Sequence, residues 1–199
     1  MDDIIINNSV EKLYIIGKSK ESSVLKFNDS KGIILNNLLY EANQEIKFVN
    51  VTIIGHMELY SIVNVTIEDV ILNGSALFDR ANKYLWATEE YNYNTEYMEK
   101  NLYVTIIMKN FTFNALTNTA YRCLNLYGNV IINDSNFYGH SSCVYNLLDY
   151  NGESIYNLKI FNSYFNGMYT NKCLNIYNAV KSVIESSTFE NGVANDYGG

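Results

Sequence analysis

The sequence predicts an all-β solenoid, in which about eight coils of chain stack short parallel strands on one another. The main observation is a unit that recurs three times toward the C-terminus, with a Ser three positions after an Ile and a Phe two positions after that Ser. Its copies are VIINDSNFYG (130–139), LKIFNSYFNG (158–167) and VIESSTFENG (183–192). Units of this length cannot each bury an apolar face alone, so they must stack on their neighbours.

The composition agrees with stacked strands. The chain has no proline, which would remove a backbone N–H that strand pairing needs, and it is rich in Asn, which tolerates the left-handed conformations of tight turns. A genome rich in A and T would also produce a bias toward Asn, Ile, Tyr and Lys. The composition therefore supports the repeat without adding an independent argument.

One apolar anchor in each coil continues the repeat upstream. The near copies LYIIG (13–17) and VTIIG (51–55) are separated by two coils of equal length, and GIILN (32–36) lies halfway between them. Apolar residues alternate with polar ones around each anchor and end at Gly or Asn, a pattern that indicates strands joined by sharp turns. The predicted anchors are Ile15, Ile34, Ile53, Leu72, Phe113, Phe137, Phe165 and Phe189.

One coil is too long, because the interval from Leu72 to Phe113 exceeds the intervals on either side of it. The surplus is predicted to be a loop insertion at 75–103, within a single domain that spans 1–199. In repeat proteins, such insertions map to loops on one face, which is often the binding face.

The charge balance excludes some classes of partner. The chain has 14 basic and 21 acidic residues, a net charge of −7, which argues against binding to nucleic acid and to anionic membranes. No apolar run approaches the roughly 18 residues that a membrane span requires, so no membrane insertion is expected.

With this coil pattern, the chain resembles the right-handed parallel β-helix superfamily, the pectate-lyase-like group. Its last segment, FENGVANDYGG (189–199), resembles the FxxN and GGA-type repeats of secreted or surface β-helix proteins. The resemblance implies a right-handed parallel β-helix, an extracellular or cell-surface location, and a chain that is a fragment of a longer repeat protein. It specifies a fold and not a reaction.

A narrower resemblance is to the Asn- and Tyr-rich, Cys-containing β-helix modules of anaerobic fungal cellulosome scaffoldins. It depends on composition and on three strands that open with Cys: CLNLYG (123–128), CVYNLL (143–148) and CLNIYN (173–178). In scaffoldins such a module is a cohesin that receives dockerins. The resemblance therefore implies a non-catalytic protein-binding module with a dockerin as its partner and no cofactor.

The insertion supplies the predicted binding residues. Tyr and Trp suit recognition surfaces because they bury a large area with few rotatable bonds and keep a polar atom. The candidates, which would stack on sugar rings or dock a small protein, are Tyr84, Trp86, Glu89, Glu90, Tyr91, Tyr93 and Tyr97. Outward Tyr138, Tyr164 and Tyr169 would extend this surface if they share a face. The alternative is that the insertion only packs along the solenoid to cover an edge.

The alternative function is a carbohydrate-active enzyme, either a polysaccharide lyase or a glycoside hydrolase, or a carbohydrate-binding adhesin. Asp69 and Asp134 occupy the same predicted column two coils apart, about 10 Å at the spacing of stacked strands, near the upper end of the carboxylate separation in inverting glycosidases. The column also holds Asn110, Asn162 and Ser186, so the favoured interpretation is that its members are turn residues.

The other reactive residues predict no site. The three Cys, at positions 123, 143 and 173, stand far apart in the chain without a nearby His, which matches no zinc signature. A buried column of thiols is the default expectation, with at most one pair bridged between adjacent coils. His140 precedes two Ser, but no acid or oxyanion hole stands at a recognisable spacing, so it is interpreted as a turn residue.

Overall fold

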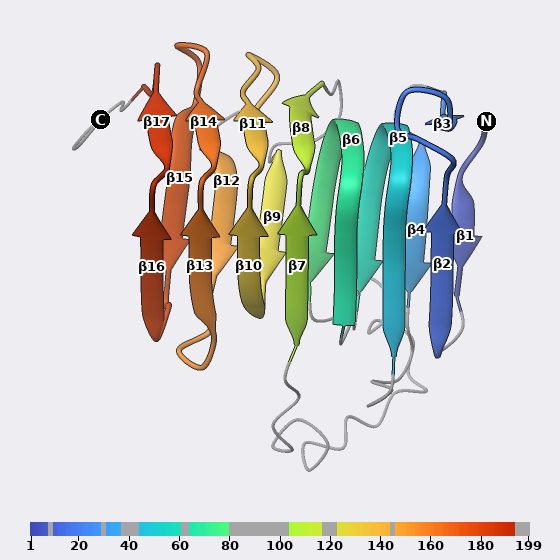
Figure 1. The fold of residues 1–199 in the computed structure, drawn as a ribbon, viewed down its shortest axis with the longest axis horizontal. Helices are drawn as coiled ribbons and strands as arrows, with labels where there is room; N and C mark the ends of the chain where they lie inside the picture. The colour runs from blue at the N-terminus through green and yellow to red at the C-terminus, as the bar shows by residue number, and fades with distance from the viewer. Residues whose placement is uncertain are drawn as a thin grey trace, which may run out of the picture.

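The computed structural model describes residues 1–7, 10–28, 31–36, 44–60, 64–79, 104–116, 123–143 and 146–193. These residues form 17 strands and no helix, in agreement with the all-β prediction. All the pairings between the strands are parallel, and they join the strands into one curled sheet (Figure 1). The fold is therefore a parallel-strand, solenoid-like structure.

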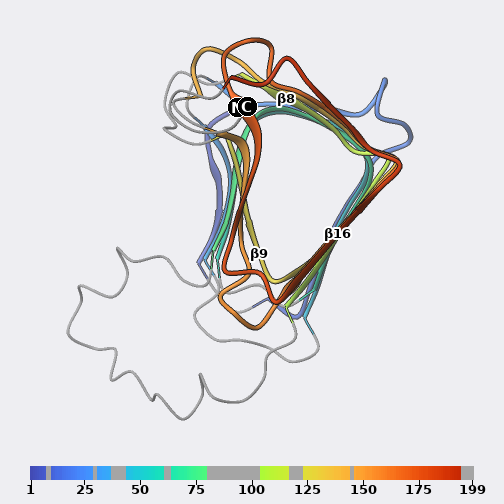
Figure 2. The ribbon, with the colours of Figure 1, turned by 90° about the vertical axis from the view of Figure 1, so that its left-hand side faces the viewer.

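Viewed along its long axis, the curled sheet has three sides (Figure 2). Two long strands, β5 (Glu45–Tyr60) and β6 (Asn64–Asp79), run across all three sides and pair with each other over almost their whole length. The first side also contains β2 (Lys12–Ile16), β7 (Thr105–Lys109), β10 (Asn129–Asn133), β13 (Asn157–Phe161) and β16 (Lys181–Glu185).

The other two sides are built in the same way. The second side contains β3 (Val24–Lys26), β8 (Thr112–Ala115), β11 (Asn136–Tyr138), β14 (Tyr164–Asn166) and β17 (Thr188–Glu190). The third contains β1 (Ile4–Ile6), β4 (Gly32–Asn36), β9 (Leu124–Tyr127), β12 (Asn146–Asn151) and β15 (Lys172–Tyr177). With β5 and β6, each side has seven strand segments.

The predicted column of anchors is confirmed from Ile53 onward. Ile53 pairs with Leu72, and the column continues in register through Phe113, Phe137, Phe165 and Phe189. The Phe137 and Phe165 rings stack with centroids 4.4 Å apart, and those of Phe165 and Phe189 are 4.7 Å apart. On the first side, Ile132, Ile160 and Ile184 also pair in register. These side chains point inward because strand residues alternate between the two faces of a sheet.

The first two predicted anchors are wrong. Leu25, and not Ile34, precedes Ile53 in the column. Ile34 lies on the third side, opposite Glu58, and Ile15 lies on the first side, opposite Phe48. The reason is that short apolar runs occur on all three sides, so a regular spacing of anchors alone does not assign a run to a side.

The corner between the first and second sides uses left-handed backbone. We call one passage of the chain around the three sides a row. One residue in each of six rows has φ between 48° and 54°, and the short polar side chains at these positions tolerate this left-handed conformation. The six residues are Asn50, Asp69, Asn110, Asp134, Asn162 and Ser186. This confirms that the polar column predicted from the sequence is a turn.

The Ser of the repeat follows this corner and links successive rows. Ser135 donates its hydroxyl to the Asn133 carbonyl at 2.7 Å and accepts the Phe111 N–H at 3.1 Å. Ser163 accepts the Ser135 N–H at 3.2 Å in the same way, and Ser187 accepts the Ser163 N–H at 3.1 Å. Ser135 is 1% exposed, so its hydroxyl satisfies a backbone donor that water does not reach.

Candidate functional site

The predicted binding residues of the insertion lie outside the described residues. Tyr84, Trp86, Glu89, Glu90, Tyr91, Tyr93 and Tyr97 all belong to 80–103, so their surface stays a prediction. The candidate sites described below come from the three sides of the sheet.

A tyrosine patch lies on the outer face of the second side. We use this name for Tyr138, Tyr164, Asn166 and Glu190, which come from β11, β14 and β17. Each of these strands turns a Phe inward, so the residues on either side of that Phe face outward. The ring centroids of Tyr138 and Tyr164 are 5.8 Å apart, and the two ring planes are inclined at 56°. These two tyrosines therefore share a face, which is the condition that the sequence left open.

Hydrogen bonds fix the ring of Tyr164. Its hydroxyl donates to the Glu190 carboxylate and accepts the Asn166 Nδ2 amide at 2.8 Å. The hydrogen bond to Glu190 raises the pKa of Tyr164 above its usual value. Asn166 is held in turn, because its Oδ1 accepts the Met168 N–H at 2.8 Å. The patch thus presents an aromatic surface whose polar atoms are positioned before a ligand arrives.

Tyr169 adds an exposed ring next to the patch in sequence. It lies in the turn that follows β14, with φ of 57° and 76% of its surface exposed. Its N–H bonds to the Asn191 carbonyl at 2.8 Å, which fixes the backbone of the turn. Rigid, exposed tyrosines with polar neighbours can bury area against a protein or stack on a sugar ring with little loss of conformational entropy.

A second candidate site is a groove of about 410 Å³ on the third side. Its floor carries a row of outward side chains, Asn125, Asp149 and Asn175, which pair in register across β9, β12 and β15. We call this site the third-side groove. Its lining residues are Leu77, Phe78, Asp79, Asn125, Leu126, Tyr127, Asn146, Asp149, Tyr150, Asn151, Glu153, Asn175 and Tyr177.

The sequence interpretation missed this groove, although a signal was present. The strands LNLY (124–127) and CLNIY (173–177) carry an Asn between two inward apolar residues, and LLDYN (147–151) carries Asp149 at the equivalent place. Alternation alone identifies these positions as outward. These three side chains meet because of the register between β9, β12 and β15. The three strands that were predicted to open with Cys did not give that register.

Asp69 and Asp134 lie in one column two rows apart, as the sequence predicted, and a catalytic role for them stays a prediction. Asn110 stands in the row between the two carboxylates and donates its Nδ2 to Asp69. Lys109 pairs with Glu68 at 2.9 Å on the adjacent positions. Both Asp residues occupy left-handed corners, where the backbone conformation by itself explains a short polar residue.

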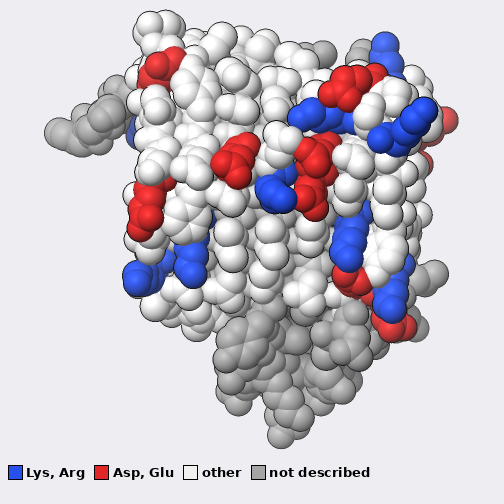
Figure 3. All heavy atoms as spheres, viewed as in Figure 1, with Lys and Arg blue, Asp and Glu red and all other residues white. Residues whose placement is uncertain are grey.

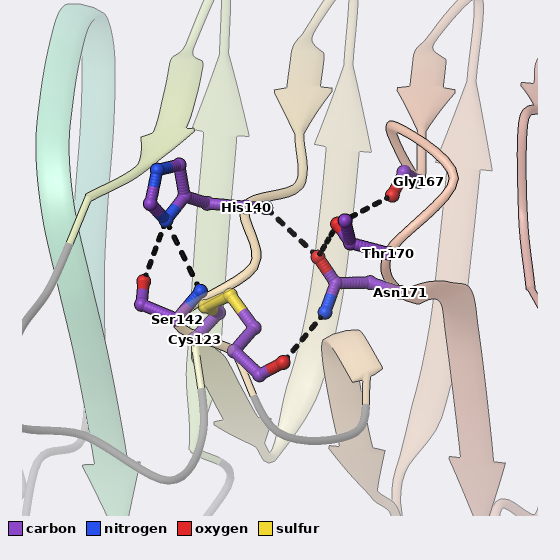
Figure 4. The surroundings of a disulfide bond; sticks show 7 residues. Cys123, His140, Ser142, Gly167, Thr170 and Asn171 are labelled. Atoms are coloured by element: carbon purple, nitrogen blue, oxygen red, sulfur yellow. Dashed lines mark hydrogen bonds between the residues drawn. A yellow bond between two sulfur atoms is a disulfide. The ribbon is translucent and has the colours of Figure 1, made fainter.

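His140 belongs to a turn that a buried Asn fixes in place (Figure 4). Asn171, which is fully buried, accepts the His140 N–H on Oδ1 at 2.8 Å and donates Nδ2 to the Cys143 carbonyl at 2.9 Å. His140 Nδ1 accepts the Ser142 N–H at 3.1 Å and lies 2.8 Å from Ser142 Oγ. These contacts explain the His and Ser as parts of the turn, as the sequence predicted.

Cys143, at the end of this turn, forms a disulfide with Cys123, which directly precedes β9, while Cys173 is a free, half-buried thiol. The expected column of three thiols is wrong, because Cys143 lies out of register with Cys123 and Cys173, but the single bridged pair that the sequence allowed is present. Burial raises the pKa of the Cys173 thiol, which lies 3.4 Å from the Glu190 carbonyl. Leu147, and not Cys143, occupies the position opposite Cys173, since Leu148 pairs with Leu174.

Charges of both signs are interspersed over the first and second sides (Figure 3). The described residues contain no group of three or more His, Cys, Asp or Glu that would hold a metal ion. Within the same ranges, no helix is long and apolar enough to cross a membrane.

A comparison of the chain with protein-family models, with curated proteins and with solved structures finds no match.

Proposed function

We propose that this chain is a right-handed parallel β-helix that serves as a non-catalytic, cohesin-like module of a scaffold protein and receives a dockerin. Three observations support the fold: all pairings are parallel, three sides repeat in the same order, and the inward columns keep their register. The resemblance of the sequence to scaffoldin modules supports the choice of partner.

The tyrosine patch is the observation on which the binding function depends. Its rings are adjacent, and hydrogen bonds to Asn166 and Glu190 hold Tyr164 in one orientation. Tyrosines that are ordered before binding lose little entropy in a complex, and Tyr is enriched among the residues that dominate interface energetics. A docked protein would cover the rings and leave the acidic Glu190 at their edge.

The proposed location is extracellular or on the cell surface. The Cys123–Cys143 disulfide supports it, because disulfides persist mainly in oxidising environments. Seven Asn-x-Ser/Thr sequons, at Asn7, Asn28, Asn50, Asn64, Asn73, Asn110 and Asn133, are compatible with secretion.

Isothermal titration calorimetry with dockerin-type proteins tests this function. A Tyr138→Ala/Tyr164→Ala double variant is expected to weaken binding by about thirtyfold or more, because truncation of even one hot-spot tyrosine costs about 2 kcal/mol or more. Tyr14→Ala is the matched control, since Tyr14 is 44% exposed and lies on the first side. Equal affinity for the double variant and the native chain would remove the patch as the binding site.

The insertion is tested in the same titration with a Trp86→Ala/Tyr91→Ala variant. A loss of affinity in this variant alone would assign the binding site to the insertion. A loss in both variants would indicate that the insertion and the tyrosine patch both contact the dockerin. Absence of binding to every dockerin-type protein would contradict the cohesin-like function itself.

The alternative is carbohydrate binding or cleavage. The pair of tyrosine rings beside the Asn166 amide favours it, because sugars stack on aromatic rings and hydrogen-bond to amides. Incubation with pectic and hemicellulosic polymers, with and without calcium, would reveal new reducing ends or unsaturated products. Cleavage that disappears in Asp134→Asn would favour an enzyme over the proposed module.

A further inference from the structure

The third-side groove contains a carboxylate that is held rigidly but lacks a cationic partner among the described residues. Asp149 accepts the Asn146 Nδ2 amide at 2.7 Å and the Asn175 Nδ2 amide at 2.8 Å, both on Oδ1. Its Oδ2 accepts no hydrogen bond from the part of the chain that the structure describes. Two amide donors thus fix the orientation of the carboxylate while one oxygen stays open to a ligand.

The lining of the groove is acidic and aromatic. Asp79, Asp149 and Glu153 line it, whereas no Lys, Arg or His of the described residues does. Tyr177, which is 60% exposed, also lines the groove and brings an aromatic ring to it. A cation would meet both a carboxylate and an aromatic quadrupole in this groove, and each of them attracts positive charge.

A buried amide also points to a ligand at this site. Asn125 lines the groove next to Asp149 in register and is only 9% exposed. Its Oδ1 is buried and has no hydrogen-bond partner among the described residues. An unsatisfied buried acceptor costs free energy, so a donor that a ligand brings would be favourable there.

We propose that the third-side groove binds a cationic side chain, Arg or Lys, on an extended segment of a partner protein. The ammonium or guanidinium group donates to Asp149 Oδ2 and packs against the ring of Tyr177. The site is separate from the tyrosine patch, since the two lie on different sides of the sheet. It adds a second contact to the proposed function and depends on that function only for the source of the segment.

Nuclear magnetic resonance titrations with blocked peptides test this site without any partner protein. The probe is Gly-Arg-Gly-Arg-Gly, and its neutral control replaces each Arg with citrulline, which keeps the shape but removes the charge. The side-chain amide signals of Asn146 and Asn175 report on the groove, because both amides bind Asp149. We expect these signals to shift with the Arg peptide and to stay unchanged with the citrulline peptide.

Asp149→Asn is the decisive variant. Its amide oxygen can still accept the two Asn hydrogen bonds, so the fold is retained while the charge is lost. We expect this substitution to lower the affinity for the Arg peptide about tenfold. Asp134→Asn removes the same charge at the corner beside the second side and is expected to change the affinity less than about twofold, because the two carboxylates do not share a site.

Other outcomes overturn the proposal or separate it from the cohesin-like function. Binding of the citrulline peptide or of cellohexaose at equal strength would assign the groove to neutral ligands, including sugars. An equal loss in Asp149→Asn and Asp134→Asn would indicate attraction by net charge alone. If the Arg peptide binds but no dockerin does, the groove stands and the cohesin-like function fails. If a dockerin binds equally to the Asp149→Asn variant and the native chain, and no Arg peptide binds, the cohesin-like function stands and the groove is not a cation-binding site.

Discussion

The rows formed by β5 and β6 differ from the later rows in how the chain leaves the second side. The interval from Ile53 to Leu72 is shorter than the interval from Phe137 to Phe165, although both pairs are neighbours in one column. In the short rows, one strand continues through a single glycine, Gly55 or Gly74, onto the third side. The later rows leave the second side through turns at 139–143 and 167–171. The core register of the strands is the same in both, so the extra residues are accommodated outside the strand pairing, although Cys143 and Asn171 among them are buried.

The corner between the first and second sides shows a second difference. The residue after the left-handed corner is Val51 or Val70 in the two long strands and Ser135 or Ser163 in later rows. All four are buried. The same backbone turn can therefore be completed by apolar packing or by a ladder of hydroxyl groups that accept N–H donors.

The largest expected effect is that of Gly74→Ala, which tests the single-glycine corner. A Cβ at this position would lie 1.7 Å from the Gly55 carbonyl oxygen, and φ is 157°. The backbone must move, so we expect the free energy of unfolding to fall by about 4 kcal/mol. Denaturant unfolding followed by circular dichroism measures this change.

Gly192→Ala is the matched control in a later row. Its Cβ would meet the Cys173 Sγ at 3.4 Å, an ordinary contact. The expected change is within about 0.5 kcal/mol. Similar losses in the two variants would mean that the short and long rows do not differ in how tightly their corners are packed.

A smaller effect is expected for Ser135→Ala, which tests the hydroxyl ladder. The substitution removes the acceptor of the buried Phe111 N–H, so we expect a loss of about 2 kcal/mol and faster hydrogen exchange at the Phe111 amide. In Ser187→Ala, the affected row lies at the more exposed end, and the loss should be below about 1 kcal/mol. An unchanged Phe111 exchange rate would contradict the role of the ladder.

The smallest effect concerns the reactivity of Cys173, which lies in β15 directly after the turn at 167–171 of a later row. Burial raises its pKa, so less thiolate is present at a given pH than for a free cysteine. Alkylation by iodoacetamide should be slower than for N-acetylcysteine, and its rate should still rise with pH where the reference levels off. Mass spectrometry should count one modified thiol before reduction and three after unfolding and reduction. Two modified thiols before reduction would contradict the free state of Cys173 alone.

The later rows could be predicted from the sequence, because each carries its own copy of the whole pattern. Ile132, Ser135 and Phe137 lie on one corner, and their copies one and two rows away repeat the same contacts. The early rows lack the Ser, so a regular spacing assigned Ile15 and Ile34 to the wrong sides. Alternation marks inward positions but does not state which side they belong to.

The pairing of Cys123 with Cys143 illustrates the same limit. Their separation in the sequence, about the length of one coil, suggested equivalent positions in two rows. Leu147 takes the equivalent position instead, and Cys143 reaches the disulfide from the preceding loop. A spacing in the chain cannot separate a core position from a loop that folds back onto the core.

By itself the sequence determined the all-β, parallel-strand repeat, the inward Phe and Ile columns and the left-handed polar corner, because these depend on residues within one unit. Only the tertiary structure decided how the strands of the third side pair, and with them the disulfide and the third-side groove. The physical reason is that Asn125, Asp149 and Asn175 come together only through the register between strands that are distant in the sequence and carry no copy of the repeated unit. That register is set by the packing of the whole core.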